Sequence, residues 1–253
     1  MGFFDRFKRP DKPKEPTPTV DQPVAPLVFQ SAGSFEFASC PGEHALQHLE
    51  KLRAEGRSTG FTVILLGGKD DAEGLAENRE FSKTSTEECL RLAAGVDVEK
   101  WLKEQVEGDP ECFQAETGDW PSEVPDAGGI SAHLEVLSRK PKKAAYLAKI
   151  PTARNWEAPA YIGMGGWNAC PYSAVLTAFA KRWHERYGAE IVSITHDVME
   201  FTVTKPPTSK EAALELAKEQ YIFCSDIVDQ GVGDVSTLAA TLLNSRYWYF
   251  WWD

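Results

Sequence analysis

The 253-residue sequence lacks several features that mark common functional classes. No apolar run approaches the roughly 20 residues that span a bilayer, so no transmembrane segment is expected. The motifs GxGxxG, GxxxxGK[ST] and HExxH are missing, which predicts no nucleotide cofactor and no metal centre. The five cysteines form no CxxC pair and follow no secretory signal, which favours reduced thiols in a cytoplasmic protein.

Positive charge is also scarce. The chain has 27 Lys and Arg residues against 38 Asp and Glu residues, a net charge of −11. Residues 1–20 hold five basic and three acidic side chains, which leaves 22 basic against 35 acidic, or −13, for residues 21–253. Proteins that bind nucleic acid through phosphates need a basic patch, so nucleic acid is excluded as a partner. An acidic body instead favours attraction to a basic protein.

The chain divides into a tail and two halves. Repeated prolines predict a flexible tail over residues 1–26. Its first nine residues combine phenylalanine with arginine and lysine, which indicates either a frayed terminus or weak contact with a membrane surface. An irregular stretch rich in glycine and proline then separates an N-terminal α/β half, 27–130, from a C-terminal domain, 131–253.

The N-terminal half is expected to contain a βαβ unit. Residues 35–39 and 61–66 have the composition of strands, and a helical pattern lies between them. The following Gly67-Gly68 is interpreted as a plain turn in preference to a ligand-binding loop, because a lone glycine pair is no phosphate cradle. Residues 85–106 predict two helical pieces that break at Gly95.

The C-terminal domain shows an ordered series of elements. The predicted elements are a strand at 160–163, a helix from Pro171 to Gly188, a hairpin over 190–204, a helix from Ser209, a short helix at 237–243 and a strand at 247–251. This βαββα(α)β order matches the ferredoxin-like arrangement, with helices on one face of a sheet. The fold class of the whole chain is therefore predicted to be α+β.

Four motifs from about residue 151 to the end resemble a known bacterial family, the domain of unknown function 4253. They are Pro159-Ala-Tyr-Ile-Gly163 with Gly165-Gly-Trp-Asn-Ala-Cys-Pro171, Trp183 with Tyr187-Gly-Ala-Glu190, Glu219-Gln-Tyr-Ile-Phe-Cys-Ser-Asp-Ile-Val-Asp-Gln-Gly231, and Trp248-Tyr-Phe-Trp-Trp-Asp253. The resemblance implies membership and no particular reaction. It associates the chain with bacterial toxin and immunity genes.

Two polar groups are candidates for a site. The loop before Pro171 brings Asn168 and Cys170 to a helix start, where a thiolate is favoured. His184 or His196 as base and Asp226 as orienting carboxylate would complete a Cys-His-Asp arrangement, although a buried structural Cys170 is the favoured interpretation.

The second group lies in the motif around Asp226. Glu219 and Asp226 are seven residues apart and would share a helix face, where they could bind a cation or exchange protons. In the favoured alternative, Asp226 caps a turn and Gln230 satisfies backbone groups at the Gly231 bend.

Aromatic residues and histidines complete the candidates. The run from Tyr247 to Trp252 is either a core strand or a protein-binding face, since tryptophan and tyrosine dominate interface hot spots. His44 and His48 are four apart on a predicted helix, and a solvated face is favoured over a metal pair.

The sequence favours a non-catalytic protein-binding function, with a bacterial toxin of basic charge as one possible partner and the protein as its immunity protein. The binding residues expected are Trp167, Asn168, Glu219, Gln220, Asp226, Asp229, Gln230, Trp248, Trp251 and Trp252. The alternative is a hydrolase or transferase that uses Cys170, Asn168, Asp226 and His184. Neither alternative requires a cofactor.

Overall fold

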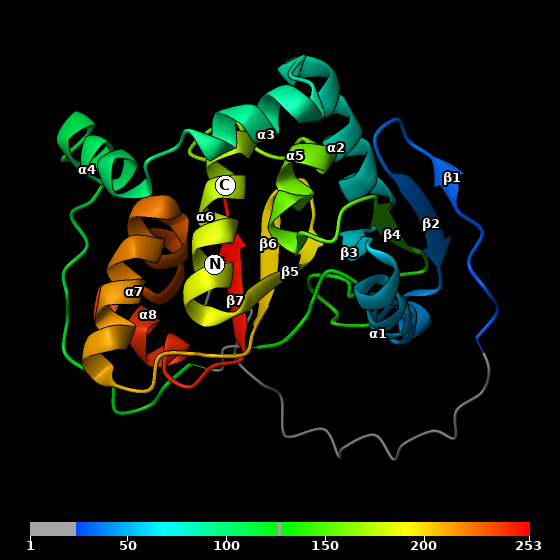
Figure 1. Cartoon of the computed structure of the whole chain (residues 1–253). Helices are drawn as coiled ribbons and strands as arrows, with labels where there is room; N and C mark the ends of the chain where they lie inside the picture. Colours follow the sequence, from blue (N-terminus) through cyan, green and yellow to red (C-terminus); the bar gives the residue numbers. More distant parts are fainter. Residues whose placement is uncertain (1–23, 126–127) are drawn as a thin grey trace.

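The computed structural model describes residues 24–125 and 128–253 (Figure 1). The predicted membrane contact of residues 1–9 lies outside the described residues, as does all but the last part of the predicted tail. Within the described ranges, no helix is both long enough and apolar enough to cross a membrane.

The described residues form one mixed sheet with the strand order β1-β2-β4-β3-β5-β6-β7. The strands are β1 (Gln30–Ser31), β2 (Glu36–Cys40), β3 (Thr62–Gly67), β4 (Ala145–Ile150), β5 (Ala189–Ile194), β6 (Val198–Val203) and β7 (Tyr247–Trp251). β3 and β5 pair in parallel, with Leu65 opposite Ser193, and the other neighbouring strands pair antiparallel. The predicted α+β class is confirmed.

Helices fill the connections between the strands. They are α1 (Gly42–Thr59), α2 (Lys69–Ser82), α3 (Thr86–Ala94), α4 (Val98–Gly108), α5 (Ala158–Ile162), α6 (Ser173–Tyr187), α7 (Lys210–Phe223) and α8 (Val235–Leu242). Several begin at a side chain that accepts a backbone N–H of the first turn, as Ser209 does from Ala212 and Asp234 from Thr237. A single turn of π-helix, Ile227–Val232, connects α7 to α8.

Both faces of the sheet are covered near its centre, and β3 shows how. Val63 and Leu65 pack in a small cluster with residues of α1, whereas Ile64 and Leu66 belong to the main core. This alternation follows from the two-residue period of a strand. The main core gathers the aromatic side chains of α6, α7 and β7, and the indole of Trp183 stacks on Phe250 with ring centres 5.0 Å apart.

Most predicted elements are present. Strands occur at the sites expected from residues 35–39, 61–66 and 247–251, and the two helical pieces around Gly95 are α3 and α4. The hairpin around residues 190–204 is β5 and β6, paired antiparallel.

The predicted strand at 160–163 is wrong, because these residues belong to helix α5 and its end. Pro159 lies in the first turn of α5, where its missing N–H costs nothing, and Gly163 ends the helix with φ of +79°. The strand in this region is β4, which precedes α5.

The order of the strands also differs from the expected arrangements. β4 lies between β2 and β3, so the two strands of the predicted βαβ unit run in the same direction without touching. β7 pairs with β6, and the ferredoxin-like order is not confirmed. Residues on both sides of position 130 therefore contribute to one sheet.

Candidate functional site

Four strands direct their carboxyl ends to the same edge of the sheet, which we call the carboxyl edge: β2, β3, β5 and β7. β2 has the direction of β3 because both pair antiparallel with β4. β3 and β5 are parallel, and β7 has the direction of β5 because both pair antiparallel with β6. The carboxyl ends of parallel strands are where α/β sheets commonly bind ligands. Gly67-Gly68, the turn Thr195-His196-Asp197 and the terminal Trp252-Asp253 all lie at this edge.

Side chains from distant parts of the chain connect at the carboxyl edge. The amide of Asn168 donates to the backbone oxygen of Asp253 at 2.8 Å. The backbone N–H of Asp253 donates to Oδ2 of Asp226 at 3.0 Å, and Gln230 donates to Oδ1 of the same carboxylate at 2.9 Å. The structure thus brings together three of the predicted binding residues, with Asp253 between them.

The loop that presents Asn168 depends on a close backbone approach. Gly165 has φ of +96°, and a Cβ at this position would lie 2.0 Å from the carbonyl oxygen of Pro171. The N–H of Gly166 points to the carbonyl oxygens of Cys170 and Pro171, both at 3.1 Å. Asn168 is exposed and has φ of +43°, a conformation that asparagine tolerates better than most residues.

Two residues of this network, Asp226 and Asp253, and two beside it, Asp197 and Asp229, carry carboxylates. We call these four carboxylates the acidic rim. The N–H of Trp252 donates to the backbone oxygen of Asp197 at 3.1 Å, which joins the β5–β6 turn to the network. Asp229 and Asp253 are exposed, and Asp197 and Asp226 are half-buried. Among the described residues, no lysine or arginine forms an ion pair with any of the four.

Asp229 shows the effect of this crowding. Burial raises the pKa of its carboxyl above the ordinary value, and the charge of Asp226 raises it further. A hydrogen bond of 3.0 Å from the hydroxyl of Tyr221 acts in the opposite direction. The rim is therefore a surface on which a basic group of a partner would relieve repulsion between carboxylates.

A second polar group lies beside the rim, around Asp71 in the first turn of α2. Oδ2 of Asp71 accepts from the N–H of Gly68 and from Nζ of Lys142, both at 2.7 Å. Oδ1 faces Nδ1 of His196 at 3.0 Å. Burial acts to raise the pKa of Asp71, but the contacts with His196, Lys142 and Gly68 together lower it to about 2. The same contact with Asp71 raises the pKa of His196, which is half exposed.

Gly67 and Gly68 allow this carboxylate to lie close to the backbone. Gly67 has φ of +81°, and a Cβ there would lie 2.3 Å from Oδ2 of Asp71. An aspartate thus occupies the start of α2, where a phosphate would bind in a nucleotide cradle. This geometry agrees with the plain turn that the sequence favours.

The predicted pairing of Cys170 with His184 is wrong. Cys170 precedes α6, whereas His184 lies in its last turn, about 16 Å away along the helix axis. His184 instead places Nδ1 3.2 Å from the backbone oxygen of Ala189 and packs against Trp156. Cys170 is buried, and burial raises the pKa of its thiol well above the ordinary value, so the thiol stays protonated at neutral pH.

Other predicted binding residues have structural positions. The carboxylate of Glu219 is buried and accepts from Nε1 of Trp183 at 2.6 Å and from the guanidinium groups of Arg182 and Arg186. Glu219 therefore forms an ion-pair group between α6 and α7. It does not share a helix face with Asp226, because α7 ends before Asp226. Gln220 is almost fully buried in the same helix.

The terminal tryptophans divide between the two faces of β7. Trp248 and Trp252 are 2% and 1% exposed and belong to the main core, so neither can contact a partner directly. Trp251 is half-buried and lies on the other face of the strand. Trp167 is half-buried and sits next to Asn168, so it remains a candidate contact of the carboxyl edge.

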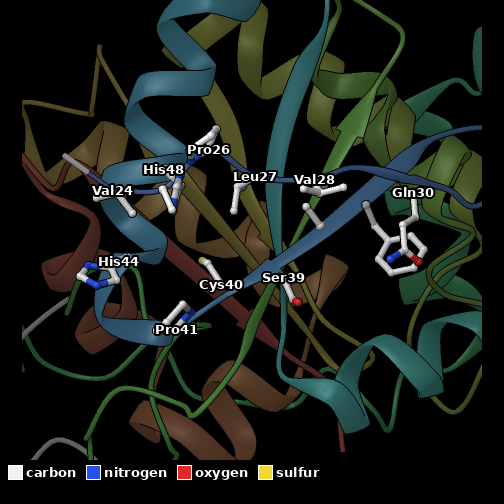
Figure 2. A pocket seen from close by; sticks show the side chains of 13 residues that line it. Val24, Pro26, Leu27, Val28, Gln30, Ser39, Cys40, Pro41, His44 and His48 are labelled. Atoms are coloured by element: carbon white, nitrogen blue, oxygen red, sulfur yellow. The ribbon is translucent and has the colours of Figure 1, made fainter.

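The two histidines of α1 differ from the predicted solvated face. His48 is buried, and burial lowers its pKa below the ordinary value, whereas His44 is partly exposed. Both line a groove of about 520 Å³ between β2 and the segment Val24–Val28 (Figure 2).

A comparison with family models tests the resemblance of the C-terminal part of the chain to the domain of unknown function 4253. A model described as "Domain of unknown function (DUF4253)" matches residues 146–253. This part of the chain is a DUF4253 domain. It contains the strands β5 to β7, the loop with Asn168 and the whole acidic rim, whereas Asp71 and Lys142 precede it. No curated protein and no solved structure matches the chain.

Proposed function

We propose that this protein binds another protein through the carboxyl edge of its DUF4253 domain, and that the partner presents a basic surface. The observation that carries the proposal is a chain of hydrogen bonds in which Asp253 connects Asn168 to Asp226, whose other oxygen accepts from Gln230. These residues come from three of the motifs that resemble the family, and their hydrogen bonds hold polar groups in place before a partner arrives. Such preorganisation lowers the cost of association.

The charge of the edge supports a basic partner. The four rim carboxylates have no lysine or arginine counter-ion among the described residues, and the chain carries a net charge of −11. Complementary charge accelerates encounter more than it stabilises the final complex. In the narrower form of the proposal, the partner is a basic bacterial toxin, and the protein is its immunity protein in the cytoplasm.

The alternative of a hydrolase or transferase has less support. Its proposed nucleophile, Cys170, is buried and protonated, and its proposed base, His184, lies at the other end of α6. Asn168 and Asp226 are engaged with each other through Asp253. An enzyme at this edge would need another nucleophile.

Coexpression with the products of adjacent genes tests the proposal, with copurification and rescue of growth as the two readouts. The informative variant combines Asp226→Asn with Asp229→Asn, which removes two charges from the rim and keeps the side-chain shapes. The matched control combines Glu50→Gln with Glu55→Gln, two exposed residues of α1.

We expect the rim variant to slow association about tenfold at low salt and the control to change it little. The difference between the two should shrink at high salt. The proposal is refuted if no adjacent gene product forms a complex, or if rim and control variants bind a partner equally fast.

A further inference from the structure

Asp71, His196 and Asp197 form a group with the composition of a metal-ion site. One potential ligand atom from each lies within 4.8 Å of the other two. Nδ1 of His196 is 3.0 Å from Oδ1 of Asp71 and 3.6 Å from Oδ1 of Asp197. Bonds of about 2.0–2.2 Å to one ion would place neighbouring ligand atoms roughly 3–3.5 Å apart, so these separations need little adjustment.

We propose that these three side chains bind a divalent transition-metal ion, for which Zn²⁺ is the best match. Zn²⁺ takes histidine nitrogen together with aspartate oxygen, whereas Mg²⁺ and Ca²⁺ prefer sites made of oxygen alone. Three protein ligands leave a further position for water or for a group of a partner. The ion would replace the proton on Nδ1 of His196, which passes to solvent.

The surroundings orient two of the ligands. The second oxygen of Asp71, Oδ2, is held by Gly68 and Lys142, which leaves Oδ1 directed at His196. The hydroxyl of Thr195 donates to Oδ1 of Asp197 at 2.9 Å. Hydrogen bonds of this kind behind the ligands are a regular feature of metal sites, because they fix the ligand geometry.

Charge and access also suit a cation. Two carboxylates, a neutral imidazole and the ammonium of Lys142 leave the group with one negative charge. The side chains of Asp71, Asp197 and His196 are 14%, 27% and 50% exposed, so an ion can enter from solvent. The inference goes beyond protein binding, since Asp71 belongs to α2 and the other two ligands to the hairpin of the DUF4253 domain. A bound ion would connect the two.

The test is calorimetric titration of the full chain, freed of metal by chelation, with Zn²⁺ and separately with Mg²⁺. We expect one saturable Zn²⁺ site and no comparable Mg²⁺ binding. His196→Ala and Asp197→Asn should each weaken Zn²⁺ binding at least tenfold, because loss of a hydrogen-bond partner behind a metal ligand already costs about that much. His44→Ala is the matched control. His44 and His48 lie four residues apart in α1 and could hold Zn²⁺ adventitiously.

Thermal unfolding supplies a second readout. Zn²⁺ should raise the Tm of the unaltered chain and of His44→Ala but not that of His196→Ala, because an ion stabilises only the state that binds it. Circular dichroism shows whether each variant is folded. The proposal is overturned if millimolar Zn²⁺ gives no saturable binding, or if His44→Ala loses the binding while His196→Ala and Asp197→Asn keep it.

Discussion

Replacing Asp71 by asparagine isolates the electrostatic part of the carboxyl edge. Asparagine keeps the size of the side chain and one acceptor oxygen, but it removes the charge that Lys142 and His196 face. The structure lowers the pKa of Asp71 from 3.8 to about 2. Its contacts therefore stabilise the folded state at any pH at which Asp71 is ionised in both states.

The expected magnitude follows from proton linkage. A fall in pKa from 3.8 to about 2 corresponds to about 2 kcal/mol of stability, because each pH unit is worth about 1.4 kcal/mol. Since the folded pKa is the lower one, this stability is complete above the unfolded pKa. It is lost as the pH falls toward 2, and about half is gone at pH 3. The side chain of Asp71 is only 14% exposed, so solvent screening reduces the value little.

Urea unfolding with EDTA present measures the effect, because the chelator keeps metal ions from the carboxylate. Asp71→Asn should be about 2 kcal/mol less stable than the unaltered chain at pH 7 and about 1 kcal/mol less stable at pH 3. Glu77→Gln, on the exposed surface of the same helix α2, should leave the unfolding midpoint at pH 7 unchanged. A difference for Asp71→Asn that stays constant from pH 7 to pH 3 would show that the loss comes from packing and not from charge.

Three further predictions follow from burial and backbone geometry. Of the five cysteines, all within the described residues, Cys112 alone is exposed, so a thiol reagent should label one site per folded chain and all five after unfolding. Gly165→Ala should destabilise the fold by about 2 kcal/mol or more, because its φ is +96° and its Cβ would meet a carbonyl oxygen, whereas Gly129→Ala, with open space around it, should change the unfolding midpoint little. Glu219→Gln should cost about 3 kcal/mol in chemical unfolding, since it takes the buried carboxylate from Arg182 and Arg186 and leaves Arg182 only the exposed Glu99, and a loss near zero would contradict a structural ion pair.

Local signals explain which elements could be predicted. The helix α6 has apolar residues at intervals of three and four and ends at Gly188, whose φ of +58° favours glycine. α7 begins after Ser209, which accepts the N–H of Ala212. Each signal lies within a few residues of the element it defines. No long-range contact is needed to recognise it.

The elements that were not predicted have two causes, an ambiguous local sequence and pairing between distant residues. The short helix α5 is defined by Pro159 and Gly163 within a sequence that also suits a strand. β4 becomes a strand because it pairs with β2 on one side and β3 on the other, although more than 75 residues separate it from β3. Pairing across such a distance leaves no mark in a local pattern.

The candidate site divides in the same way. The sequence by itself determined that Asn168, Asp226 and Gln230 are among the polar residues to consider, together with Glu219, Gln220 and Asp229, because each lies in one of the motifs. Only the tertiary structure decided that Asp253 connects Asn168 to Asp226 and that His196 faces Asp71, 125 positions earlier in the chain. The physical reason is the parallel pairing of β3 and β5, which brings the ends of distant strands to one edge, where short side chains reach each other.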